Sequence, residues 1–163
     1  MAKALIMGVG NLLLSDEGFG VHVIREFEKK YRIPPEVEVV DGGCVGFSLA
    51  DYLREKDLVL LVDVIADKAP PGSYRVLSAQ ELESFPTVGL NSCHQASLIE
   101  ALKFAEFAGL RPERFKIFAA VPEDLSPGLE LSPGLRKTVP VALKWLEEEL
   151  VSAGFRVEKG PCA

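Results

Sequence analysis

The stretch AKALIMGVGNLLLSDEGFGVHVIREFEKKY, residues 2–31, decides the fold because it contains one strand, one loop and one helix in succession. Residues 2–10 form an apolar run that ends at a glycine, which is the pattern of a strand buried on both faces. Residues 17–31 then place apolar and charged residues at helical spacing. A doubly buried strand followed by a helix predicts a parallel sheet covered by helices.

The alternation of strand and helix patterns continues along the chain. Further strands are expected at 37–43, 57–65 and 114–123, with an edge strand within 68–82, and helices are expected at 47–56, from Ser92 onward and from Ser132 to about residue 152. The predicted fold is therefore an α/β three-layer sandwich with a mostly parallel central sheet and one antiparallel edge strand. We expect a single domain over residues 1–155 and a disordered tail over 156–163.

Two helices have apolar residues from which a buried side is predicted. In the long helix after Ser92 the expected buried residues are Ala96, Ile99, Leu102, Phe104 and Phe107. In the last helix they are Val139, Ala142, Leu143 and Leu146.

Composition and charge exclude several classes of partner. The chain has 163 residues, of which 48% are hydrophobic, and a net charge of −6, which argues against nucleic acid and anionic membranes. No apolar run has the length needed to span a bilayer, and residues 1–11 lack the features of a signal peptide. The three cysteines have no CxxC spacing, which is typical of a protein from the reducing cytoplasm.

Reactive side chains follow several of the predicted strands. In an open parallel sheet, ligands bind beyond the carboxyl ends of the strands, where Glu17, Asp41, Asp63 and His94 are expected to meet. The loop after the first strand lacks GxGxxG and GxxxxGK[ST], and its carboxylates would repel phosphate, so no nucleotide is expected. Gly18 and Gly20 each cost a helix about 1 kcal/mol relative to alanine, which indicates that another backbone must approach closely there.

Each candidate also has a structural interpretation. Asp63 ends a very apolar strand, where an acid either binds a partner or caps a nearby loop. The acids at 16 and 17 are also favoured by the positive end of the following helix, and His22 is interpreted as a histidine on a helix face. As a set, Glu17, Asp63 and His94 suit a hard or borderline divalent metal, although their spacing matches no local metal motif.

Four motifs in this order carry a family resemblance: GVGNLLLSDEGFG at 8–20, DGGCVG at 41–46, LLVDV at 60–64 and SCHQASL at 92–98. Together they resemble the endopeptidases that mature [NiFe] hydrogenases, and the resemblance covers nearly the whole chain. It implies an enzyme that removes the C-terminal extension of a nickel-loaded hydrogenase large-subunit precursor. In this family, removal of the extension lets the large subunit close over its metal centre.

The resemblance also implies roles for individual residues. Glu17, Asp63 and His94 match the family's metal-contacting positions, and Asp41 matches an aspartate implicated in substrate recognition or cleavage. We therefore expect Asp41, Glu17 and Asp63 to serve catalysis and Asp16 to shape the loop. The glycines of this loop are expected to let the substrate backbone come close. The nickel is expected to arrive with the substrate, with a resident catalytic metal as the competing interpretation.

The chain departs from the family pattern at three positions. Cys44 stands where a threonine is usual, Val64 where an alanine is usual, and Gln95 where an acid usually follows the histidine. None of these is an expected metal ligand, but Gln95 removes a potential partner for His94.

Three other functions remain open from the sequence. A non-proteolytic, nickel-dependent assembly chaperone would use the same residues. A cysteine peptidase would use Cys44 or Cys93 as nucleophile with His94 as base, although adjacent residues on a helix diverge. A flavodoxin-like nucleotide-binding domain is disfavoured by the acidic first loop.

Overall fold

The computed structural model describes residues 3–43, 48–85 and 93–160, with side chains in the last range from 98 onward. In these ranges five strands form one sheet in the order β3-β1-β4-β6-β5. The strands are β1 (Ala4–Val9), β3 (Val37–Gly43), β4 (Leu58–Val64), β5 (Tyr74–Ser78) and β6 (Arg114–Ala120). The first four strands of this order are parallel, and β5 pairs antiparallel with β6. The predicted mostly parallel sheet with one antiparallel edge strand is confirmed.

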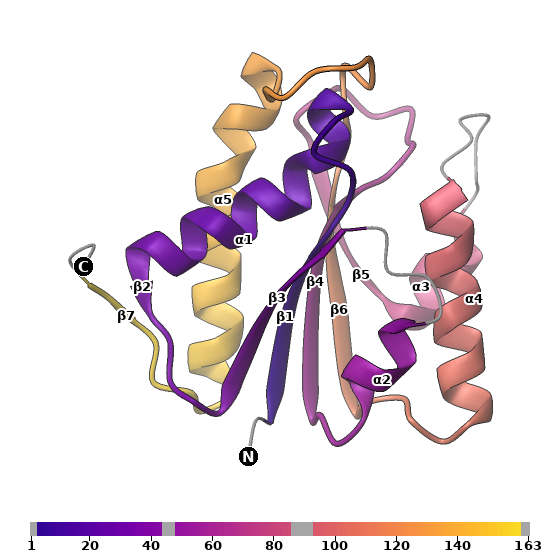
Figure 1. The fold of residues 1–163 in the computed structure, drawn as a ribbon, viewed down its shortest axis with the longest axis vertical. Coiled ribbons are helices and arrows are strands. Elements are labelled where there is room, and N and C mark those ends of the chain that lie inside the picture. The colour runs from indigo at the N-terminus through magenta and orange to yellow at the C-terminus, as the bar shows by residue number, and fades with distance from the viewer. Residues whose placement is uncertain (1–2, 44–47, 86–92, 161–163) are drawn as a thin grey trace.

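Helices cover both faces of the sheet (Figure 1). One face, called the α1 face below, packs against α1 (Phe19–Lys30) and α5 (Pro133–Ser152). The opposite face, called the α4 face, packs against α2 (Leu49–Leu53), α3 (Ala79–Ser84) and α4 (Cys93–Phe107). This arrangement is the expected three-layer sandwich.

The two central strands β1 and β4 are buried along their whole length because helices lie on both of their faces. Successive side chains of a strand point to opposite faces. Ile6 and Leu60 accordingly belong to the hydrophobic cluster on the α1 face, whereas Leu5 and Leu61 belong to the cluster on the α4 face. The same alternation fixes the face on which each polar residue of these strands lies.

The buried side of α4 matches the sequence prediction only in part. Leu102 is buried and Ile99 packs against the core as predicted, while the side chain of Ala96 lies outside the described residues. The prediction was wrong for Phe104 and Phe107, which are 48% and 90% exposed. The helix instead buries Leu98, Ala101 and Ala105 together with Leu102, which share one side at helical spacing. In α5, by contrast, the predicted residues Ala142, Leu143 and Leu146 are buried, and Val139 packs against the core.

The chain end also differs from its prediction. Val157 is buried, and β7 (Glu158–Lys159) pairs antiparallel with β2 (Tyr31–Arg32), which follows α1 directly. Residues 156–160, expected to be part of a disordered tail, are therefore ordered by strand pairing with a segment far away in the sequence. No helix in the described part of the chain combines the length and the apolar character needed to cross a lipid bilayer.

Candidate active site

The strand order changes direction between β1 and β4 at the carboxyl end of the sheet. After β1 the chain passes through α1 on one face to β3, and it then returns through α2 on the opposite face to β4. The connections therefore leave β1 and β4 in opposite directions, which is the topological switch point where open α/β sheets bind their ligands. Glu17 follows β1 and Asp63 lies near the end of β4, so both predicted residues flank this point.

The glycines of the first loop bring the protein's own backbone segments together. A Cβ atom on Gly20 would lie 2.1 Å from the carbonyl oxygen of Val62 in β4, and one on Gly8 would lie 2.3 Å from the carbonyl oxygen of Gly20. Gly10 has φ +143°, and its Cβ would lie 1.9 Å from the carbonyl oxygen of Glu17. The close approach inferred from the sequence is thus real. The partner is the protein's own backbone, including Val62 of the sheet, so the expectation that these glycines admit the substrate backbone is wrong.

Asp16 joins the first loop to a segment more than a hundred residues away. Its carboxylate is fully buried and accepts hydrogen bonds from the backbone N–H groups of Glu123, Asp124 and Ser132 at 2.9, 3.0 and 2.7 Å. The Ser132 hydroxyl donates a fourth bond, at 2.8 Å. Asp16 and these donors are called the Asp16 clamp below. The expectation that Asp16 shapes the loop is confirmed, because its oxygens are engaged with the protein's own backbone.

A second set of contacts strengthens the same junction. The backbone N–H of Ser15 donates to the Gly128 carbonyl at 2.9 Å, and the Ser15 hydroxyl donates to the Ser126 carbonyl at 2.8 Å. Ser132 is the N-terminal cap residue of α5, as expected, but its side chain binds Asp16 and makes no capping bond to its own helix. The short 3-10 helix η1 (Ser15–Gly18) is thereby fixed in place.

Glu17 lies within η1, directly after the Asp16 clamp. The residue is half-buried, and its backbone N–H donates to the Leu14 carbonyl at 3.1 Å. Because η1 contacts both α1 and β4, Glu17 is held next to the switch point by a rigid turn. Two neighbouring carboxylates therefore have different surroundings: Asp16 is enclosed, and Glu17 lies at the carboxyl end of the sheet.

Asp63 is one of two carboxylates that are buried among the described residues. Its side chain is 2% exposed, and Oδ1 accepts a hydrogen bond from the backbone N–H of Val64 at 2.7 Å. Its position in β4, two residues after Leu61, places it on the α4 face. Its burial at the strand end beside the switch point makes Asp63 a candidate for chemistry.

His94 is the second residue of α4, and its side chain lies outside the described residues. The backbone places it on the Asp63 face, at the end of the helix nearer the carboxyl end of the sheet, because α4 leads into the start of the parallel strand β6. Among the described side chains, no group of three His, Cys, Asp or Glu residues is close enough to hold a metal ion. The described part of the predicted set is therefore the carboxylate pair Glu17 and Asp63, whose oxygen donors suit a divalent cation. Cys44 and Cys93 lie outside the described side chains as well.

Asp41 lies on the other face of the sheet from Asp63. It pairs in register with Gly8, near the end of β3, and its side chain forms an ion pair with Arg25 of α1 at 3.3 Å. The side chains of Arg25 and Asp41 are 53% and 44% exposed. The structure thus brings Asp41 to the same end of the sheet as Glu17 and Asp63, but toward α1.

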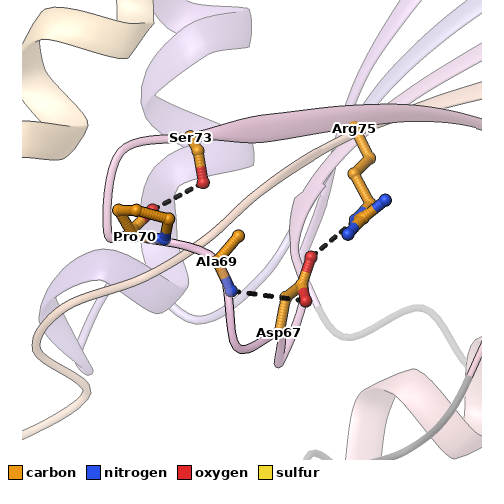
Figure 2. Close-up of polar contacts among 5 residues, drawn as sticks. All are labelled: Asp67, Ala69, Pro70, Ser73 and Arg75. Atoms are coloured by element: carbon orange, nitrogen blue, oxygen red, sulfur yellow. Dashed lines mark hydrogen bonds and ion pairs between the residues drawn. The ribbon is translucent and has the colours of Figure 1, made fainter.

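Arg75, which belongs to none of the sequence motifs, lies near the start of β5 at the same end of the sheet. Asp67, in the loop after β4, accepts a hydrogen bond from Nε of Arg75 at 2.5 Å, as Figure 2 shows. This bond, together with the N–H of Ala69, holds the pKa of Asp67 below its ordinary value. The signal that was available is a lone charged residue among apolar neighbours in the edge strand, in the stretch YRVL.

His22 of α1 does not join the candidate site. Burial is the main cause that lowers the pKa of its imidazole, and the positive charge of Arg25 lowers it further. A hydrogen bond with the backbone of Leu129 opposes this change. His22 thus packs beneath the loop that the Asp16 clamp holds, in agreement with its interpretation as a helix-face residue.

Known proteins resemble this chain over nearly its full length. The family model HycI: Hydrogenase maturation protease matches residues 21–149. The Hydrogenase 2 maturation protease of Escherichia coli K12 is 31% identical over 153 residues, which cover 93% of each chain. The hydrogenase expression/formation protein HupD of Rhizobium leguminosarum is 33% identical over 160 residues, which cover 98% of this chain and 79% of the relative.

A solved structure agrees with these relatives. The hydrogenase maturating endopeptidase HybD from E. coli superposes with a TM-score of 0.90 at 30% identity, over 98% of both chains. The chain belongs to the hydrogenase maturation protease family. This hydrogenase maturation protease is accordingly a hydrolase of the endopeptidase class, as the motifs had indicated. The [NiFe] hydrogenase maturation protease HybD from Thermococcus kodakarensis, at 24% identity and a TM-score of 0.73, shares the fold.

Proposed function

We propose that this endopeptidase removes the C-terminal extension of a [NiFe] hydrogenase large-subunit precursor in the cytoplasm, and that nickel carried by the precursor is its recognition element. The observation that carries the proposal is the pair of carboxylates Glu17 and Asp63 at the switch point of a hydrogenase maturation protease. Oxygen ligands from these residues and a nitrogen ligand from His94 are suited to a borderline divalent ion.

The nickel is part of the substrate in this proposal. Three protein ligands leave coordination positions for groups of the precursor, so binding would depend on a correctly loaded metal. The buried position of Asp63 favours such a role because a cation offsets the cost of keeping its charge away from water. Cleavage then occurs only after the metal has been inserted.

In hydrolysis a water molecule attacks the scissile carbonyl, a base accepts its proton, and this proton passes to the amine that leaves when the C–N bond breaks. We assign the base to a carboxylate beside the nickel, Glu17 or Asp63, with the metal polarising the reacting groups. Asp41, which lies on the α1 face and pairs with Arg25, is assigned to contact with the substrate at the same end of the sheet.

The test compares nickel-loaded and nickel-free precursor with the wild-type enzyme and with Glu17→Gln. Intact mass spectrometry follows the loss of the C-terminal peptide. We expect cleavage of the loaded precursor alone, and a reduction by more than about a hundredfold in Glu17→Gln because a ligand charge is lost. Glu28→Gln, at an exposed position of α1, is the matched control and should cleave normally.

Other outcomes point to the alternatives. Equal cleavage of the nickel-free precursor would remove nickel as recognition element and favour a resident metal. Nickel-dependent binding without cleavage would favour an assembly chaperone. Inactivity of a Cys44→Ser, Cys93→Ser double variant that still folds would instead support cysteine catalysis.

A further inference from the structure

Asp63 and Arg75 occupy the same row across three neighbouring strands. Asp63 of β4 pairs with Ala119 of β6, and Ala119 pairs with Arg75 of β5. Residues of one row point to the same face of a sheet, and strands lie about 4.8 Å apart, so the Cα atoms of Asp63 and Arg75 are about 10 Å from each other. Ala119 belongs to the cluster on the α4 face, which places both side chains on that face.

The guanidinium group of Arg75 is held on one side. Figure 2 shows Asp67 bound to it through Nε, while the other carboxylate oxygen of Asp67 accepts from the Ala69 N–H at 3.4 Å. The turn that carries Asp67 is closed by a bond from the Ser73 hydroxyl to the Pro70 carbonyl. On another side, the guanidinium carbon lies 5.5 Å from the centre of the Phe85 ring. Asp67 and Phe85 together fix the orientation of the cation.

The terminal nitrogens of Arg75 have no hydrogen-bond partner among the described residues. The hydrogen bond from this guanidinium to those residues runs from Nε to Asp67, and the side chain is 50% exposed. The two terminal nitrogens of a guanidinium match the two oxygens of a carboxylate, so such a pair is geometrically specific. The side chain of Arg75 is therefore suited to binding a carboxylate from outside the chain.

The acidic residues at the carboxyl end of the sheet indicate a function for Arg75. Glu17, Asp41 and Asp63 are acidic and the chain has a net charge of −6, so the carboxyl end of the sheet would repel an acidic peptide. Arg75 offers an attractive contact on the Asp63 face. Its separation of about 10 Å from Asp63 corresponds to about three residues of extended peptide.

We propose that Arg75, oriented by Asp67, binds a carboxylate of the precursor's C-terminal segment about three residues from the group that faces Asp63. This assignment rests on the proposed function and adds to it a specificity-determining contact. The carboxylate is either an acidic side chain or the chain terminus of the precursor, since both present the same two oxygens. Asp67 acts as a positioning residue.

The test measures cleavage kinetics of nickel-loaded precursor with Arg75→Gln, Arg75→Lys and a control. We expect KM to rise about tenfold in Arg75→Gln with kcat nearly unchanged, because a charge-assisted hydrogen bond in binding is lost. Arg75→Lys should recover part of the loss, since it restores the charge without the planar pair of donors. Arg54→Gln removes a similarly exposed arginine, which forms a weaker surface ion pair with Asp51 before β4, and should match the wild type.

Altered precursors identify the carboxylate. One set replaces the acidic residues of the C-terminal segment by amides, and another carries a C-terminal carboxamide. The precursor form that lacks the bound carboxylate should have a KM about tenfold higher with the wild-type enzyme. Its KM should not rise further with Arg75→Gln, as a double-mutant cycle requires.

Two results overturn the inference in different ways. In the first, the wild type cleaves the precursor, and Arg75→Gln either has the same KM or raises the KM equally for every precursor form. The contact is then absent, and the proposed function stands. If the wild type cleaves no form, the proposed function fails and this inference fails with it. Cooperative thermal unfolding of Arg75→Gln, expected only slightly below the wild-type temperature at pH 7, shows that the variant is folded.

Discussion

Two regions at the carboxyl end of the sheet use the same side-chain chemistry for different purposes. In the Asp16 clamp, a buried carboxylate accepts four hydrogen bonds from the protein and joins η1 to residues 123–132. In the row from Asp63 to Arg75, one carboxylate is buried at a strand end, and the half-exposed Arg75 forms its hydrogen bond to the described residues through Nε. The fully enclosed Asp16 builds the site, whereas the half-exposed Arg75 is suited to binding substrate.

The contrast is sharpest between Asp16 and Glu17, which are adjacent in the sequence. Asp16 satisfies the backbone of a distant loop, and Glu17 is held beside the switch point as a result. The clamp therefore supports function indirectly, by fixing the turn that carries the proposed metal ligand.

The largest effect on stability is expected from Asp16→Ala. Loss of this buried carboxylate removes the acceptor of three backbone N–H groups and of the Ser132 hydroxyl, so the free energy of unfolding should fall by about 3–5 kcal/mol. Urea denaturation followed by circular dichroism measures the change. Glu17→Gln is the matched control. Its free energy of unfolding should stay within about 1 kcal/mol of the wild-type value, because it removes only one half-buried charge. Equal stability of Asp16→Ala and Glu17→Gln would break the comparison.

A smaller loss is expected from Gly20→Ala, which tests how the clamped loop packs on the sheet. The added methyl group would lie 2.1 Å from the Val62 carbonyl oxygen and 2.6 Å from that of Val9, so α1 must shift outward. Such overpacking should lower the free energy of unfolding, measured with denaturant, by about 2–3 kcal/mol. Gly134→Ala is a suitable control, since its methyl group would meet its nearest neighbour at 3.7 Å, an ordinary contact. A Gly20→Ala protein as stable as Gly134→Ala would contradict this packing.

The smallest effect concerns the pH dependence of the Arg75–Asp67 pair. The bond from Arg75 lowers the pKa of Asp67 in the folded state, so the pair stabilises the fold above the ordinary aspartate pKa of about 3.9. This contribution is lost as the pH falls from there through the folded-state pKa. The unfolding temperature of the wild type should therefore be slightly higher than that of Arg75→Gln at pH 7, and the difference should shrink as the pH is lowered toward 3. An advantage that is independent of pH would indicate packing of Arg75 and not its charge.

Much of the fold follows from local sequence patterns. The doubly buried strands β1 and β4 and the amphipathic helix α5 were predicted because their periodicity is expressed within a few turns or residues of chain. The prediction failed for α4, where large exposed phenylalanines obscured a stripe of leucines and alanines. It also failed for β7, whose pairing with β2 depends on a partner that is remote in the sequence.

The candidate site divides in the same way. The sequence by itself determined that Glu17, Asp41 and Asp63 would lie at one end of a parallel sheet, because the ends of its strands carry them. Only the tertiary structure decided that Asp41 and Asp63 lie on opposite faces, that Asp16 binds donors 107–116 residues away, and that Arg75 joins the row of Asp63. The physical reason is that periodicity is a local property of the chain, whereas these pairings depend on strand register and on the packing of distant loops.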